Sequence, residues 1–107
     1  MAGGGNRLVL DATLATRDGL RYTPAGIPAL SLTLEHASMQ PEAGGQRKVD
    51  LELAAVAYGP VAQALAGIAP GAALRCEGFL ARRYRTGTTL ALHIERFELT
   101  AQSSEGH

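Results

Sequence analysis

The chain has 107 residues with 10 Lys+Arg, 10 Asp+Glu, 3 His, 1 Cys and 46% hydrophobic residues, a length that suits one domain with its own core. The lone Cys76 cannot close an internal disulfide, and no apolar run approaches the roughly 18–20 residues that cross a bilayer, so a disulfide-built scaffold and a membrane span are excluded. Residues 1–5 lack the charged and apolar regions of a signal peptide, and we expect a small soluble cytoplasmic domain without a membrane partner.

Apolar and polar residues alternate with a period of two along most of the chain, which is typical of half-buried β-strands. Such stretches cover residues 7–14, 29–36, 49–55, 74–80 and 90–99. In the last stretch the apolar positions change from even at Ile94 to odd at Phe97. Because a slip of one residue turns later side chains to the opposite face, we predict a β-bulge near Glu95-Arg96, which also helps a small sheet to curl.

A helical pattern separates the third and fourth stretches. Between Gly59 and Pro70, Val61, Leu65 and Ile68 have the i, i+4, i+7 spacing of one helix face, and a proline at position 60 suits the first helical turn. Three strands, one short helix and two strands are the order of the OB-fold. We therefore predict an all-β, five-stranded OB-fold Greek-key barrel over residues 6–100, with a short helix between strands 3 and 4. An open α+β sheet with one helix is the alternative.

The connections are predicted from their glycines and polar residues. Met39 to Gln46 is expected to be a flexible loop between strands 2 and 3, and Arg85 to Thr88 a tight turn between strands 4 and 5, with Gly87 at positive φ. Residues 1–5 and 101–107 are rich in glycine, serine and polar side chains, and we expect both ends to be flexible.

Basic residues gather locally although the formal net charge is zero. Arginines neutralise the phosphates of a single strand while an aromatic ring stacks on a base. On an OB barrel the face of strands 2–3 and the loops near the strand 4–5 turn form the oligonucleotide groove. We therefore predict that Arg47-Lys48 and residues 82–85 meet on one surface, which Arg21 and Tyr22 could extend. The alternative for each segment is ordinary solvated charge. The candidate DNA-binding residues are Arg21, Tyr22, Arg47, Lys48, Arg82, Arg83, Tyr84 and Arg85.

Other residues with possible chemistry have simpler explanations. Phe79 is predicted on the outward face of strand 4, as a stacking platform or an oligomer contact. His36 and His93 have no metal-binding motif nearby, and Cys76 falls on an inward face as a small core residue. No glycine-rich phosphate loop opens a helix. We therefore expect no catalytic activity, no metal and no cofactor.

Six short segments occur in one order across residues 6–100. They are Asn6-Arg7-Leu8-Val9-Leu10, Gly26-Ile27-Pro28, Leu34-Glu35-His36, Glu42-Ala43-Gly44, Gly78-Phe79 and Leu92-His93. In these segments the chain resembles the PriB family (primosomal replication protein N), relatives of the bacterial single-stranded DNA-binding proteins. The resemblance implies a homodimeric OB-fold protein that binds single-stranded DNA in replication restart. It also implies that the protein stabilises and stimulates the PriA helicase at stalled forks and works with other primosome proteins.

The resemblance is incomplete at the DNA-binding positions. Arg47 matches the family's basic site on strands 2–3, and residues 82–85 match its basic 4–5 loop. Gly45 and Asp50 stand in the region where the best-known members carry aromatic residues, and a threonine at position 88 or 89 replaces a further basic residue. We therefore expect weaker DNA binding than in those members. One alternative is a protein–protein adaptor that acts mainly by docking on the helicase. Another is a stand-alone DNA-coating protein, a class that usually carries a long acidic-tipped tail.

Overall fold

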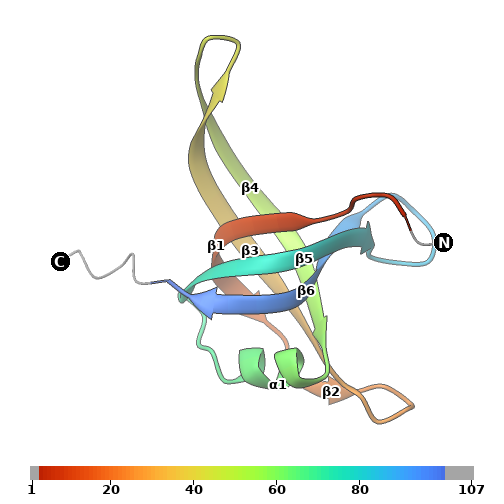
Figure 1. Ribbon diagram of the computed structural model, residues 1–107. Helices are drawn as coiled ribbons and strands as arrows, with labels where there is room; N and C mark the ends of the chain where they lie inside the picture. The colour runs from red at the N-terminus through yellow and green to blue at the C-terminus, as the bar shows by residue number, and fades with distance from the viewer. Residues whose placement is uncertain (1–2, 101–107) are drawn as a thin grey trace.

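The structure, a computed structural model, describes residues 3–100 and consists mainly of long strands (Figure 1). The elements are β1 (Leu8–Arg17), β2 (Arg21–Tyr22), β3 (Pro28–Glu42), β4 (Gly45–Tyr58), α1 (Pro60–Ala66), β5 (Ala73–Arg82) and β6 (Leu90–Leu99). The strand order is β1-β5-β6-β4-β3-β2, and an additional β1–β3 pairing closes the sheet into a barrel. The β4–β6 pair is parallel and the other pairs are antiparallel.

This topology confirms the predicted OB-fold barrel and excludes the open sheet. The five long strands are the expected ones, although all except the last are longer than their alternating stretches, and the two-residue β2 was not predicted. Helix α1 lies between β4 and β5, as predicted, with a proline in its first turn and Gly67 at its C-cap. Among the described residues, no helix is long and apolar enough to span a bilayer.

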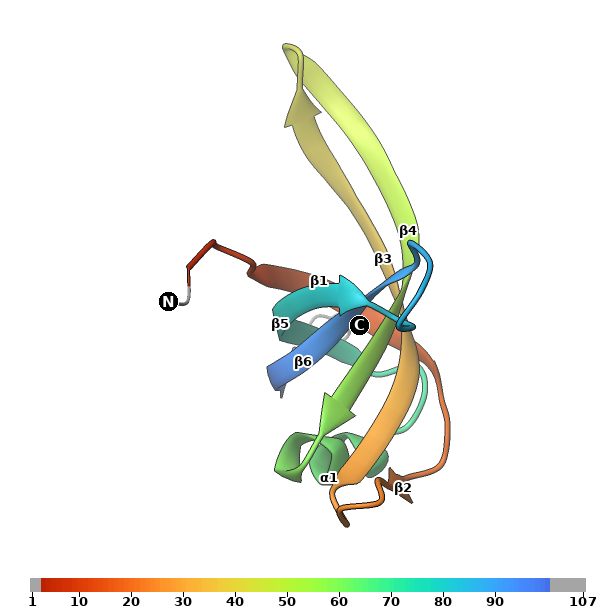
Figure 2. The ribbon, with the colours of Figure 1, turned by 90° about the vertical axis from the view of Figure 1, so that its right-hand side faces the viewer.

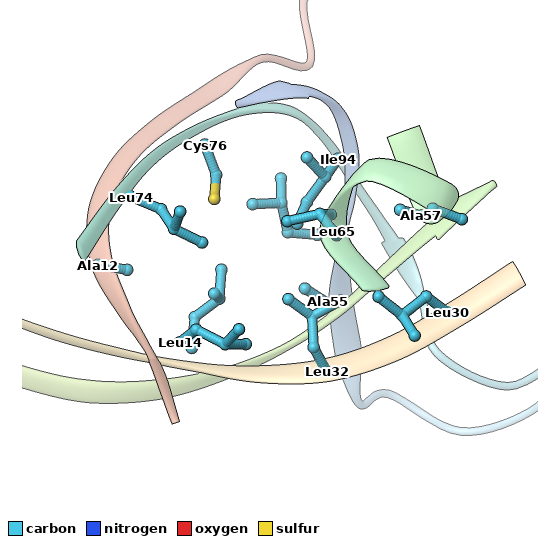
Figure 3. Packing of buried hydrophobic residues seen from close by; sticks show 13 residues of the cluster. Ala12, Leu14, Leu30, Leu32, Ala55, Ala57, Leu65, Leu74, Cys76 and Ile94 are labelled. Atoms are coloured by element: carbon cyan, nitrogen blue, oxygen red, sulfur yellow. The ribbon is translucent and has the colours of Figure 1, made fainter. Parts of the chain in front are cut away.

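The core occupies the inside of the barrel, where the inward side chains of all the long strands meet (Figure 3). Leu14, Leu34, Leu74 and Leu92 are fully buried there, and Leu65 of α1 closes one end of the barrel. Each of these strand leucines belongs to the apolar face that the alternation defined. Burial of a leucine side chain contributes about 1.5–3 kcal/mol, so this inner face accounts for the closure of the sheet.

The predicted bulge lies where expected, in β6. Glu77 pairs with Arg96 and Gly78 pairs with Ile94, so Glu95 is the extra residue on β6. The strands approach so closely at this point that a β-carbon on Gly78 would overlap the carbonyl oxygen of His93. After the bulge Phe97 packs against the core, as its shifted position predicted.

The prediction of a flexible loop from Met39 to Gln46 is wrong. These residues continue β3 and β4 in one regular hairpin, and only Ala43 and Gly44 form the turn, with φ of 53° and 83°. Positive φ at both central residues is the geometry of a tight type I′ turn, which alanine at the first position does not announce. The far half of this hairpin projects well beyond the barrel (Figures 1 and 2). We call residues 37–50 the arm.

The predicted tight turn from Arg85 to Thr88 is also wrong. Strand β5 ends at Arg82 and β6 begins at Leu90, so a seven-residue loop, 83–89, joins them. Its base is closed by the Arg83 N–H, which donates to the Thr89 carbonyl at 2.7 Å. All of its side chains are exposed, so no apolar contact extends the strand pairing toward the tip. Gly87 has the expected positive φ, at 97°.

The ends of the chain were predicted to be flexible. Residues 3–5 are exposed and belong to no helix or strand. Residues 1–2 and 101–107 lie outside the described residues, so the expectation for them stays a prediction.

Candidate nucleic-acid interface

A hollow of about 350 Å³ opens on the outer face of the barrel, beside the start of the 83–89 loop. We call it the groove. Its larger lining side chains are those of Arg21, Tyr58, Arg82, Arg83, Tyr84 and His93. Small side chains of β3, β4 and β6, such as Ala54 and Ala91, leave its floor open.

Strand pairing places these side chains together. On β4, Ala55 and Ala57 are buried, so the alternate residues Ala54, Val56 and Tyr58 face outward. Strand β2 pairs with β3 and brings Arg21 over the same face, where its Nη1 donates to Ser31 Oγ at 3.2 Å. The groove therefore lies on the face of β3 and β4, which are strands 2 and 3 of the OB barrel. It lies between the connection from β1 to β3, which includes β2, and the 83–89 loop.

The arginines of this region form no ion pair with any residue that the structure describes. In the part of the chain that the structure describes, ion pairs engage Arg7, Arg47, Lys48, Arg75 and Arg96. None of these pairs involves Arg21, Arg82, Arg83 or Arg85, all of which are exposed, and no carboxylate of residues 3–100 lines the groove. The surface around the groove is therefore locally positive, although the formal net charge of the chain is zero.

The opposite end of the β5–β6 pair has the contrary arrangement. Glu77 accepts hydrogen bonds from the Nε atoms of Arg96 at 2.9 Å and Arg7 at 3.0 Å, and these bonds lower the pKa of its carboxyl. Arg75 donates to Asp11 at 2.8 Å, which lowers the pKa of that carboxyl as well. The positive charges at this end are therefore balanced by neighbouring carboxylates.

Some of the predicted site residues come together and others do not. Arg21, Arg82, Arg83 and Tyr84 all line the groove, so Arg21 extends the surface formed by the 4–5 loop. The guanidinium carbon of Arg83 lies 5.3 Å from the centre of the Tyr84 ring, in a cation–π contact. Arg85 lies further along the same loop, exposed.

Tyr22 lies outside this cluster. It follows Arg21 on the two-residue β2, where it pairs with Pro28, and its side chain is 61% exposed. It does not line the groove. Successive residues of a strand point to opposite sides, which accounts for the separation of Tyr22 from its neighbour.

Arg47 and Lys48 lie in the arm, away from the groove. Arg47 is nine positions from Val56 along β4, which corresponds to about 30 Å of extended strand. Each cation also forms an ion pair with an acidic neighbour. Arg47 Nη1 lies 3.4 Å from Glu42 Oε1, and Lys48 Nζ lies 3.7 Å from Asp50 Oδ2. The predicted meeting of these cations with residues 82–85 is not seen within one chain.

The sequence did not single out Tyr58 and His93 as site residues. The Tyr58 and His93 ring centroids are 6.1 Å apart, and Phe79 stacks on the other side of His93 at 4.8 Å. Alternation placed His93 and Phe79 on outward faces, but Tyr58 lay beyond the predicted end of its strand at Ala55. Extension of that strand by three residues would have identified it.

The structure also locates the residues considered for metal or thiol chemistry. Within residues 3–100 no group of three or more His, Cys, Asp or Glu side chains is placed to hold a metal ion. Cys76 is fully buried, and burial raises the pKa of its thiol to about 11. At neutral pH it is an unreactive core residue, as its inward position predicted.

A closed five-stranded barrel, with a groove on the face of OB strands 2–3 and arginine-bearing loops beside it, defines an OB-fold domain with an oligonucleotide-type face. Comparison with known proteins refines this class. The model of a family described as "another single-strand binding protein family" matches residues 6–96.

Similar proteins cover nearly the whole chain. Replication restart protein PriB of Bordetella pertussis is 39% identical over 98 residues, 92% of each chain, and that of Nitrosomonas europaea is 34% identical over 89 residues, 83% of this chain and 82% of its own. The solved structure of PriB from Ralstonia solanacearum has a TM-score of 0.83 at 41% identity, covering 90% of this chain and 98% of its own. The chain therefore belongs to the PriB family of replication restart proteins.

A more distant structure shares the fold alone. The single-stranded DNA-binding protein from Thermus aquaticus has a TM-score of 0.75 at 24% identity, covering 96% of this chain and 53% of its own. The barrel architecture thus extends beyond the PriB family.

Proposed function

We propose that this protein binds single-stranded DNA in the groove, as a non-catalytic accessory protein of replication restart in the cytoplasm. The observation that carries the proposal is the exposed arginines at positions 21, 82 and 83, which have no carboxylate partner among residues 3–100 and stand around a groove with exposed tyrosines. Single-stranded DNA offers both a phosphate for each arginine and an aromatic face for each ring. The names of the similar proteins support the restart role.

The contacts proposed from the sequence divide into two regions. Arg82, Arg83, Tyr84 and Arg85 form the principal contact together with Arg21, while Tyr22 stands at its margin. Arg47 and Lys48 form a second contact in the arm, reached by a longer strand. Their acidic neighbours weaken this second contact, which agrees with the expectation of modest affinity.

The salt dependence of binding tests this proposal. Anisotropy of labelled oligo-dT titrated at several salt concentrations should give a log–log slope of about −2 to −3.5, as expected for about three to five neutralised phosphates. The double variant Arg83→Ala/Arg85→Ala should lower the magnitude of the slope by about 1.4. The matched control is Arg75→Ala/Arg96→Ala, which removes the same charge from the ion-paired end. Binding that does not depend on salt, or an equal loss in both double variants, would contradict the proposal.

We also propose that the protein stabilises and stimulates the PriA helicase at stalled forks with other primosome proteins. The family resemblance supports this finer role. A second candidate function, docking on the helicase with only weak DNA affinity, is favoured by the arm. The arm projects away from the groove, and its Met39 is 58% exposed. A charge-reversed Arg85→Glu variant that loses helicase stimulation but keeps its affinity for DNA would favour this second function.

A homodimer is proposed from an open strand edge. Residues 8–13 of β1 pair with β5 on one side, whereas β3 pairs only with residues 13–17 on the other. Within the described residues the second edge of 8–12 therefore has no strand partner, and such edges favour pairing with another strand. Light scattering should give twice the mass of one chain, and a monomeric mass at micromolar concentration would contradict this.

A further inference from the structure

Three rings form a row across the outer surface of the barrel. They belong to Tyr58 on β4, His93 on β6 and Phe79 on β5, which are neighbouring strands (Figure 1). The Phe79 and His93 rings are stacked with an interplanar angle of 16°, and the Tyr58 ring is tilted by 33° from that of His93. His93 thus lies between the two other rings.

The backbone fixes the middle of this row. Val56 pairs with His93 across the parallel β4–β6 pair, and Phe79 pairs with His93 across β5–β6. The close approach at Gly78 lies immediately next to this pairing. His93 is half-buried, so its ring has little freedom to move. The free end of the row is Tyr58, whose side chain is 45% exposed.

Tyr58 differs from the other tyrosine of the groove in what covers its ring. Arg83 lies over the Tyr84 ring at 5.3 Å and occupies one of its faces. The only ring contact of Tyr58 within the described residues is with His93. The small side chains Ala54 and Ala91 leave open space beside it in the groove.

We infer that Tyr58 is the residue on which a base of single-stranded DNA stacks, and that His93 and Phe79 are positioning residues that hold its ring toward the groove. This inference rests on the proposed function and adds to it a site for the base, distinct from the arginines that contact phosphate. A row of stacked rings accepts any base, because every base has a π-face. The contact therefore adds affinity without sequence preference.

Substitution of Tyr58 should separate the contribution of base stacking to DNA affinity from the contribution of the arginine charges. Tyr58→Ala should weaken oligo-dT binding by about 5- to 160-fold, the range for loss of one stacked base, and leave the salt slope unchanged. Tyr58→Phe keeps the ring and should bind like the wild-type protein. Leu99→Ala is the matched control, since Leu99 is exposed but lies outside the groove, at the ion-paired end of β5–β6. Equal affinity of Tyr58→Ala and wild type would overturn the inference.

The positioning residues have their own test. His93→Ala should weaken binding by about two- to tenfold, the range for loss of an aromatic pair, and His93→Phe should restore it. A residue that only stabilised the barrel would lower the melting temperature without changing the affinity of the folded protein. Thermal unfolding of each variant provides this comparison.

Intrinsic fluorescence gives a readout that needs no loss of a side chain. The chain has 3 Tyr and no Trp, so its emission comes from tyrosine alone. A base stacked on Tyr58 should quench this emission during titration with oligo-dT. Tyr58→Phe should lose more of the quenching at full binding than either Tyr22→Phe or Tyr84→Phe.

The two proposals fail in different ways. Unchanged quenching in Tyr58→Phe would overturn the inference even if Tyr58→Ala does not fold. Salt-dependent binding with no contribution from Tyr58 would leave the proposed function intact and remove only the stacking site. A wild-type protein that does not bind oligo-dT would remove both.

Discussion

The two ends of the β5–β6 pair use the same residue type for different purposes. Toward the 83–89 loop, Arg82 and Arg83 have no carboxylate partner in the described part of the chain and stand beside the row of rings. Beyond the bulge, Arg75 and Arg96 hold Asp11 and Glu77 at hydrogen-bond distance. An arginine count therefore says little about a binding surface. What matters is which arginines the fold leaves without an acid.

The bulge at Glu95 separates these two ends. Without it, the alternation of β6 would continue unchanged, and Arg96 would point inward where Phe97 now packs against the core. One inserted residue thus lets a single strand carry His93 outward at one end and Arg96 outward at the other. Exposed ion pairs of this kind contribute only about 0–1 kcal/mol each, so stability comes mainly from the core below them.

The largest effect is expected from a substitution at Gly78, where β5 and β6 approach each other closely next to the bulge. Gly78→Ala places a methyl group on the His93 carbonyl oxygen and should lower the free energy of unfolding by more than about 3 kcal/mol, measured by urea denaturation. The matched control is Gly87→Ala in the 83–89 loop, where a β-carbon meets open space. Its cost should be about 1 kcal/mol, from the positive φ of 97° alone. Equal losses of unfolding free energy in the two variants would show that the close approach of β5 and β6 at Gly78 does not constrain the residue at this position.

A smaller effect is expected from the thiol inside the barrel, beneath the ion-paired end. The pKa of Cys76 is raised from 9.0 to about 11 by burial, so the folded state holds the proton more tightly than the unfolded chain. The full stability is present below pH 9 and should fall by about 1.4 kcal/mol per pH unit between pH 9 and 11.

The control for this measurement is Cys76→Ala. Other groups also titrate at high pH, and the difference in unfolding free energy between the two proteins isolates the thiol. Parallel pH profiles would mean that the thiol ionises freely in the folded protein. They would then indicate that this end of the barrel opens more readily than the ion pairs suggest.

Most of the fold followed from local pattern. The alternation located every long strand, and the shift from Ile94 to Phe97 located the bulge, because a buried face permits only one register. The arm was missed because its residues no longer face a core, so the pattern that announces a strand disappears while the backbone pairing continues. The turn at Ala43 gave no signal, since alanine rarely takes positive φ.

The sequence predicted which kinds of side chain form the site better than it predicted which individual residues the fold brings together. Arg82 and Arg83 were identified from their density in the sequence, and the OB-fold itself placed them beside Arg21. The separation of Arg47 from this group depends on how far the arm extends, which the sequence did not reveal. Tyr58 was missed for a related reason, since only the full length of β4 brings it beside His93.

The smallest expected effect tests the comparison directly, by freeing arginines where they are now paired. Glu77→Gln removes the carboxylate that accepts hydrogen bonds from Arg7 and Arg96. If the ion pairs are what prevents the arginines at this end from binding phosphate, the variant should bind oligo-dT about two- to threefold more tightly. Its salt slope should be steeper by about 0.7, as expected for one additional phosphate contact. Anisotropy at low salt measures both quantities.

Glu35→Gln is the matched control for Glu77→Gln. It removes the same charge, but Glu35 faces Glu52 across the β3–β4 pair and forms no ion pair within residues 3–100, so no arginine is released. A gain confined to Glu77→Gln would show that local pairing, rather than total charge, decides which surface attracts DNA. An equal gain in both variants would mean that the long-range field of the whole molecule governs binding, because each variant changes the net charge equally. The contrast between the two ends of β5–β6 would then have no bearing on DNA affinity.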